Sequence, residues 1–175
     1  MRNVRYNVVS TLDGYIAGPN GEFDWIPHDP TVDFAALFAT VDTVLIGRKT
    51  FEVLKGMGGV GPWPKGSAVY VFSTTLRPED HPGVTIVRDD AADVVRGLRA
   101  ANGGDIWLFG GGELFRALLA AHQVDRLEIT IAPVLLGGGT PLLPVTDSRT
   151  PLKLETTKQY PSGMITLGYS PKTDP

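Results

Sequence analysis

Short apolar or alternating segments recur along the chain and predict a series of β-strands. The run TVLIG is apolar and β-branched, as expected for a strand buried on both faces, and IWLF is of the same kind. RLEITI alternates strictly between polar and apolar residues, which is typical of a half-buried strand. The predicted strands span residues 4–12, 15–17, 43–47, 68–73, 84–87, 106–109, 126–131 and 164–169.

Amphipathic stretches lie between these strands and predict helices. Asp29-Pro30 has the form of an N-cap followed by proline at the first helical position, and apolar residues follow at helical spacing from Phe34 to Val41. Further helices are predicted over 48–55, after Asp90 and after the glycines at 110–112, and a loop over 56–66. The alternation predicts an α/β fold with a mostly parallel central sheet, helices on both faces and antiparallel strands at the C-terminal end.

The composition narrows the class of protein. With 175 residues, 42% of them hydrophobic, the whole chain 1–175 is expected to form a single domain. Sixteen Lys and Arg stand against 19 Asp and Glu, so we expect neither nucleic acid nor a membrane surface as a partner. No apolar stretch approaches the roughly 20 residues of a membrane span, and a cytoplasmic location is expected.

Metal and thiol chemistry are not predicted. The chain has no cysteine, which excludes disulfides, thiolate zinc sites and thiol nucleophiles. Its three histidines, at 28, 81 and 122, are scattered without the spacing of metal ligands.

Three consecutive glycines, Gly110, Gly111 and Gly112, separate the run IWLF from the next helical pattern. Glycines in a strand-to-helix turn let the backbone approach a ligand closely, and the new helix offers free N–H groups and a positive dipole end. Phosphate is the natural ligand of such a turn, although a tight turn without a ligand is an open alternative. The strict dinucleotide fingerprint is not met, because Phe115 stands where its third glycine is required.

A second turn of this kind occurs in IGRKTFE, where Gly47 ends a strand and Arg48 and Lys49 open a helix. Cations in a first turn oppose the helix dipole, so this pair is explained more easily if it meets phosphates than if it only reaches solvent. The hydroxyls of Ser73 and Thr74 follow a third strand end.

The motifs VSTLDGYIAG, LIGRKTFE, VFSTTL and LFGGGELFRALLAAHQVDRLEITIAPVLLGGGTPLLP together resemble the dihydrofolate reductase fold. The resemblance is to the version in the reductase domain of bacterial riboflavin biosynthesis, here standing alone, and it runs from about residue 4 to 169. It implies a dihydrofolate reductase-like three-layer fold and NADPH as cofactor.

The resemblance also implies which residues bind the cofactor. Ile16 and Ala17 would lie by the nicotinamide, and Glu113 stands awkwardly near phosphates, so that either it turns away or the preference for NADPH over NADH is weakened. The residues that would bind the phosphates and the adenosine end of the cofactor are Gly47, Arg48, Lys49, Thr50, Ser73, Thr74, Leu76, Gly110, Gly111, Gly112, Glu113 and Leu114.

The resemblance implies fewer residues for binding the substrate than for binding the cofactor. Asp33, or Asp29, matches the helix carboxylate that holds a pterin and aids its protonation, and Asp13 and Thr130 are further catalytic candidates. For Asp29 a role as helix N-cap is favoured. Tyr15 stands where riboflavin-pathway reductases usually carry Lys or Arg.

These expectations favour a reductase that transfers hydride from NADPH to a small-molecule substrate. The substrate would be a nitrogen heterocycle, a ribosylamino-pyrimidine such as 5-amino-6-(5-phosphoribosylamino)uracil, or a pterin-like compound. The alternatives are a nucleotide-binding protein without turnover and a dihydrofolate reductase proper. A homodimer that pairs through LEITIAPVLL is also expected.

Overall fold

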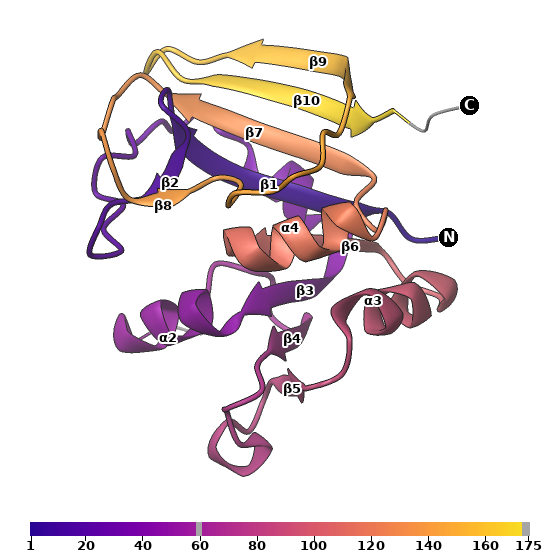
Figure 1. Cartoon of the computed structure of the whole chain (residues 1–175). Helices are drawn as coiled ribbons and strands as arrows, with labels where there is room; N and C mark the ends of the chain where they lie inside the picture. The colour runs from indigo at the N-terminus through magenta and orange to yellow at the C-terminus, as the bar shows by residue number, and fades with distance from the viewer. Residues whose placement is uncertain (59–60, 173–175) are drawn as a thin grey trace.

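A computed structural model of the chain describes residues 1–58 and 61–172, so residues 59 and 60 of the predicted loop lie outside the described part. One eight-stranded sheet, in the order β5-β4-β3-β6-β1-β7-β10-β9, runs through the molecule, and β2 pairs with β8 beside it (Figure 1). The strands are β1 (Val4–Thr11), β2 (Tyr15–Ala17), β3 (Val41–Gly47), β4 (Ala68–Phe72), β5 (Thr85–Val87), β6 (Asp105–Gly110), β7 (Arg126–Ala132), β8 (Thr140–Pro141), β9 (Leu152–Gln159) and β10 (Ile165–Pro171).

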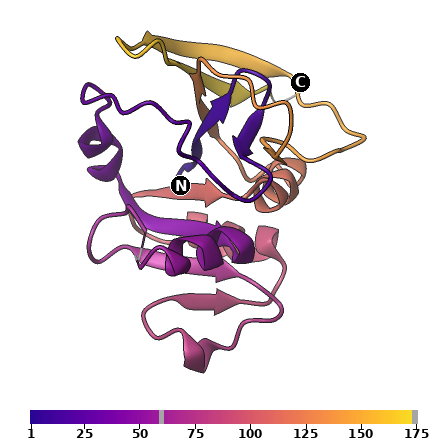
Figure 2. The same cartoon turned by 90° about the vertical axis from the view of Figure 1, so that its left-hand side faces the viewer.

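The predicted sheet architecture is confirmed. Strands β1, β3, β4, β5, β6 and β7 pair in parallel, and β10 and β9 add antiparallel strands at one end (Figure 2). Strands β3, β4 and β5 lie on one side of β1 and β7 lies on the other, with β6 inserted between β3 and β1. Ligands of open α/β sheets bind outside the carboxyl ends of the strands, where the chain changes the direction in which it adds strands.

Helices cover both faces of the sheet, as predicted. One core contains Tyr6 of β1 together with Val95 and Leu118 from two helices, and the Tyr6 and Phe115 rings stack with centroids 3.9 Å apart. The core on the opposite face contains Leu37. Among the described residues, no helix has the length and apolar character needed to cross a bilayer. The helices are α1 (Phe34–Phe38), α2 (Arg48–Gly56), α3 (Ala91–Ala100) and α4 (Gly112–Ala120), with a short 3₁₀ helix at Pro78–Asp80.

The first helix differs from its prediction. Asp33, not Asp29, is the N-cap, and its carboxylate accepts a hydrogen bond from the backbone N of Ala36 at 3.0 Å. Asp29 is buried and accepts instead from the backbone N of Thr31, which closes a turn before the helix. The predicted helix is also too long at its other end, because Val41 already belongs to β3.

Strands β8 and β9 were not predicted. β9 has the sequence LKLETTKQ, and all eight of its residues are exposed. Without a buried face the strand has no apolar alternation by which a sequence pattern could identify it. Its backbone pairing with β10 fixes it in the sheet.

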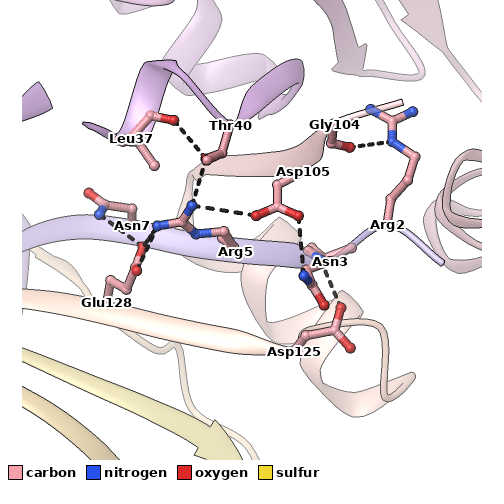
Figure 3. Close-up of polar contacts among 11 residues, drawn as sticks. Arg2, Asn3, Arg5, Asn7, Leu37, Thr40, Gly104, Asp105, Asp125 and Glu128 are labelled. Carbon is pink, nitrogen blue, oxygen red and sulfur yellow. Dashed lines mark hydrogen bonds and ion pairs between the residues drawn. The ribbon is translucent and has the colours of Figure 1, made fainter. Parts of the chain in front are cut away.

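At the amino ends of the parallel strands, charged side chains pair with one another (Figure 3). The guanidinium of Arg5 donates to both carboxylate oxygens of Glu128, at 2.7 and 2.9 Å, and to the hydroxyl of Thr40 at 2.9 Å. Asn7 donates to the same carboxylate, and Asp105 lies 3.4 Å from the guanidinium. The Arg5 side chain is only 13% exposed, so its charge depends on these partners.

Replacing Arg5 by Met is expected to lower the free energy of unfolding by about 1.5–3 kcal/mol, because it removes charge-assisted hydrogen bonds from half-buried Glu128. Urea denaturation monitored by circular dichroism measures the loss. The matched control is Arg96→Ala, which breaks an ion pair whose side chains are 64% and 68% exposed and should cost less than about 0.5 kcal/mol. Equal losses for the two variants would contradict this account of the Arg5 cluster.

Candidate functional site

Two strand-to-helix turns meet at the carboxyl edge of the sheet. Strands β3 and β6 are neighbours, with Ile46 opposite Gly110, so the turns after them lie side by side. A Cβ atom at Gly47 would lie 3.4 Å from the backbone N of Gly111, and one at Gly111 would lie 3.1 Å from Oγ1 of Thr50. Glycine at both positions therefore allows this close approach. The Gly110–Gly111 peptide bond is cis.

The helices that begin at these turns have no side-chain cap. Gly47 is the N-cap of α2 and Gly111 that of α4, and neither supplies a side-chain hydrogen bond to the first turn. The other two α-helices differ, since Asp33 caps α1 and Asp90 caps α3. The first N–H groups of α2 and α4 are thus left for another acceptor, and an anion such as phosphate is the acceptor that the helix dipole favours.

The charged side chains near the two turns would not repel an anion, because the basic ones lie at the start of α2 and the acidic one on α4 is paired. Arg48 is half-buried in the first turn of α2 and donates to Glu52 one turn later, at 2.8 and 3.0 Å, while Lys49 is exposed. Glu113 accepts two hydrogen bonds from Arg116, at 2.7 and 3.1 Å. Its carboxylate is therefore directed along α4 and neutralised there, which matches the alternative in which Glu113 turns away.

The turn after β4 forms the third part of this edge. Ser73 is buried, and its hydroxyl accepts from the backbone N atoms of Thr75 and Leu76, at 3.2 and 3.1 Å, whereas Thr74 is exposed. Arg88, which follows β5, donates to the carbonyl of Leu76 at 2.9 Å. Sequence reasoning missed Arg88, although a cation directly after a parallel strand could have identified it.

The remaining predicted cofactor residues lie on β2, at the start of α4 and in the first turn of α2. Ile16 and Ala17 lie on β2, and Ala17 pairs with Thr140 of β8. The side chain of Leu114 is buried in the core beneath α4, so only its backbone faces the turn. Thr50 reaches the glycine turn with its hydroxyl, as described above.

Asp13 holds two loops together. Its carboxylate accepts from the backbone N atoms of Leu136 and Gly137, the latter at 2.7 Å, and from the hydroxyl of Thr11. The hydrogen bond from Thr11, followed by that from Gly137, lowers the pKa of Asp13. A carboxylate stabilised in its ionised form is a poor proton donor near neutral pH. These contacts fit a positioning role for Asp13.

Thr130 belongs to a chain of hydroxyl groups. Its Oγ1 lies 2.7 Å from Oγ1 of Thr166, the residue opposite it on β10, and Thr166 in turn donates to the Tyr160 hydroxyl at 3.4 Å. Tyr160 stands at the start of the β9–β10 turn. Thr166 and Tyr160 were missed because the β9–β10 hairpin was not recognised from the sequence.

Asp29 connects that hairpin to the segment before α1. It accepts from the backbone N of Ser162 at 3.0 Å, in addition to its bonds from Thr31. The structure thus joins Thr130, the hairpin and the segment leading into α1. Exposed Asp33 caps α1, and within the described residues no hydrogen bond links it to Thr130.

The comparisons with known proteins agree with this arrangement. The chain is 32% identical to the uncharacterized protein YyaP of Bacillus subtilis (strain 168) over 96% of the chain and 94% of YyaP. The crystal structure of a putative riboflavin biosynthesis protein from Shewanella sp. PV-4 superposes with a TM-score of 0.84 at 28% identity, covering 99% and 100% of the two chains. Dihydrofolate reductase from Enterococcus faecalis, complexed with NADP(H), gives 0.72 at 20% identity over 98% and 97%.

The fold is therefore that of the dihydrofolate reductase-like proteins, as the resemblance implied. Residues 2–166 match the family described as RibD C-terminal domain, and the chain belongs to that family.

The hydrogen bonds to Asp29 predict an acid-sensitive stability. The Thr31 hydroxyl and then Ser162 hold the pKa of Asp29 well below its usual range. A lowered pKa in the folded state stabilises the protein above the unfolded-state value of about 3.9, and this contribution is lost as the pH falls toward the folded-state pKa. Asp29→Asn should therefore be less stable than wild type at pH 7, with the difference shrinking as the pH falls below about 4.

Urea denaturation of wild type and variant at pH 7, 4 and 3 measures this difference. The control is Asp24→Asn at an exposed position in the same loop. A difference between wild type and Asp29→Asn that is the same at all three pH values would show that the charge of Asp29 does not carry the effect.

Proposed function

We propose that this protein is an NADPH-dependent oxidoreductase that reduces a small heterocyclic substrate. The observation that carries the proposal is the pair of uncapped glycine turns after β3 and β6, which meet at the carboxyl edge of the sheet. Membership of the RibD C-terminal domain family supports a reductase of pyrimidine-reductase type.

The residues of this edge fit a dinucleotide phosphate. The first N–H groups of α2 and α4 would hold the pyrophosphate, since the N-cap glycines Gly47 and Gly111 have no side chain that could accept from them. Arg48, Lys49 and Arg88 would supply positive charge toward the phosphates, including the 2′-phosphate that distinguishes NADPH from NADH. When bound, NADPH supplies the hydride for the reduction of a C=N or C=O group.

On the substrate side, the chain's own groups would bind and orient the acceptor. The hydroxyls of Thr130, Thr166 and Tyr160 form a polar strip that can donate to and accept from a ring nitrogen or carbonyl. Asp13 and Asp29 would hold the surrounding loops rather than supply protons, because hydrogen bonds keep both in the ionised form. Asp33 is the remaining carboxyl among the predicted catalytic residues; it is exposed at the start of α1 and would deliver a proton through water.

We infer that the substrate is a ribosylamino-pyrimidine, a pterin or a related heterocycle. A second candidate function, nucleotide binding without turnover, is favoured by the hydrogen bonds that commit Asp13 and Asp29 to structural roles. The two functions differ in whether NADPH is consumed when an acceptor is added.

The direct test combines binding and turnover. NADPH at about 100 times its dissociation constant should stabilise the folded protein by roughly 2.7 kcal/mol, which thermal unfolding measures. Loss of NADPH absorbance on addition of a ribosylamino-pyrimidine or dihydrofolate would support the reductase and identify its acceptor. Stabilisation without oxidation by any heterocycle of such a panel would favour the binding protein. An unchanged melting curve with both NADPH and NADH would reject a nicotinamide cofactor.

Gly111→Val is expected to weaken NADPH binding at least tenfold while the protein stays folded. Gly111 has a φ of −87°, which a branched residue can adopt, and the added methyl groups fill the space proposed for the pyrophosphate. The new Cβ would also lie 3.1 Å from Oγ1 of Thr50, so a small loss of stability is expected beside the loss of affinity. Calorimetric titration with NADPH measures affinity, and circular dichroism measures folding.

The matched control is Gly66→Ala, at the amino edge of the sheet. Gly66 has a φ of +93° and open space around it, so alanine there should lower stability by about 1–2 kcal/mol without weakening NADPH binding per folded molecule. Wild-type NADPH affinity in folded Gly111→Val would place the cofactor away from this turn.

A further inference from the structure

A cavity of about 360 Å³ lies on the α4 face of the sheet. Its walls come from α4, β7, β10, the segment 142–151 that connects β8 to β9, and the first residue of β9. On α4 it is lined by residues that follow the glycines at the start of this helix, from Phe115 to Ala120. None of the residues proposed for the cofactor or for the hydroxyl strip lines it, so the proposed function leaves the cavity unexplained.

The inner walls of the cavity are apolar. Phe115 and Leu119 extend from α4, Leu127 and Ile129 from β7, and Leu167 from β10. All five are buried or half-buried, and all but Leu167 belong to the core that holds the sheet to α4. A ligand in this space would therefore rest mainly on hydrocarbon.

The polar groups that line the cavity are hydroxyls and one arginine, whose charge is paired with a carboxylate outside the cavity. Hydroxyls of Thr146, Ser148 and Thr150 line it on the side of the connecting segment. Arg116, the one charged lining residue, is bonded through two of its nitrogens to Glu113 on the previous turn of α4. An anion would have to compete with that carboxylate, whereas an uncharged molecule meets hydroxyls able to donate and accept.

Protein interiors seldom keep voids much larger than a water molecule, whereas small-molecule sites are typically about 300–1,000 Å³, apolar and furnished with few polar groups. In its size, its apolar walls and its few polar groups, the cavity resembles a small-molecule site. We propose that it is a second ligand site, which binds an uncharged, largely apolar molecule of two or three rings with one or two hydrogen-bonding groups.

Two fluorescent probes that differ only in charge test this assignment. N-phenyl-1-naphthylamine is neutral, and 1-anilinonaphthalene-8-sulfonate carries a sulfonate on the same skeleton. The neutral probe should bind saturably with one site per chain. The sulfonate should bind at least tenfold more weakly, because it would have to compete with Glu113 for Arg116 or leave its charge unpaired. Titrations are made with NADPH absent and with NADPH in excess, and the neutral probe should bind in both.

Two variants fill the cavity from opposite sides. Ala120→Trp lies at the exposed end of α4, and Thr150→Trp lies on the connecting segment; both positions line the cavity. Each should weaken the neutral probe at least tenfold. Ala100→Trp, at the exposed last residue of α3 and outside the cavity, is the matched control and should leave the affinity unchanged.

Three results would overturn the proposal. The first is displacement of the neutral probe by NADPH, which would place the probe in the cofactor site. The second is wild-type affinity for the neutral probe in both filling variants. The third is no saturable binding of the neutral probe at all. In the last case, sedimentation would show whether a second copy of the chain covers the cavity. All three results are read from binding of the probe. They therefore test the cavity whether or not the protein catalyses a reduction.

Discussion

The close approach of two backbone turns is the constraint on which the proposed site depends. Gly47 ends β3, and Gly111 follows the end of its parallel neighbour β6. The missing side chains let the turn after β6 pack against the turn after β3 and the hydroxyl of Thr50. Because glycine cannot cap a helix with a side chain, the same residues leave the first N–H groups of α2 and α4 free. The same two glycines therefore account for the close packing of the turns and for the proposed binding of an anion.

The two edges of the sheet satisfy their polar groups in different ways. At the amino edge, Arg5 and Glu128 pair with each other within the protein. At the carboxyl edge, Asp13 accepts from the backbone N of Gly137, and Asp29 accepts from the backbone N of Ser162 in the β9–β10 turn. Carboxylates used in this way shape the site but are unsuited to donate protons, which narrows the chemistry the chain itself can supply.

The sequence predicted the sheet, its helices on both faces and the glycine turns, because buried strands and strand-to-helix turns leave strong local patterns. The prediction failed where a residue's structural role depends on residues far away in the sequence. Asp29 looks like a helix cap until the distant Ser162 is brought beside it, and the fully exposed β9 has no pattern to recognise. The partners of Thr130 were missed for the same reason, since Thr166 and Tyr160 reach it only through the pairing of β10 with β7.

The most direct measurement of the central claim is an NMR titration of the ¹⁵N-labelled protein with NADPH. The account predicts that the backbone amides of Gly47, Arg48, Gly111 and Gly112 shift most, because they are the groups proposed to bind the pyrophosphate. Amides at the amino edge, such as those of Arg5 and Asp105, should shift little. Large shifts confined to residues outside the carboxyl edge, with the glycine amides unmoved, would contradict it.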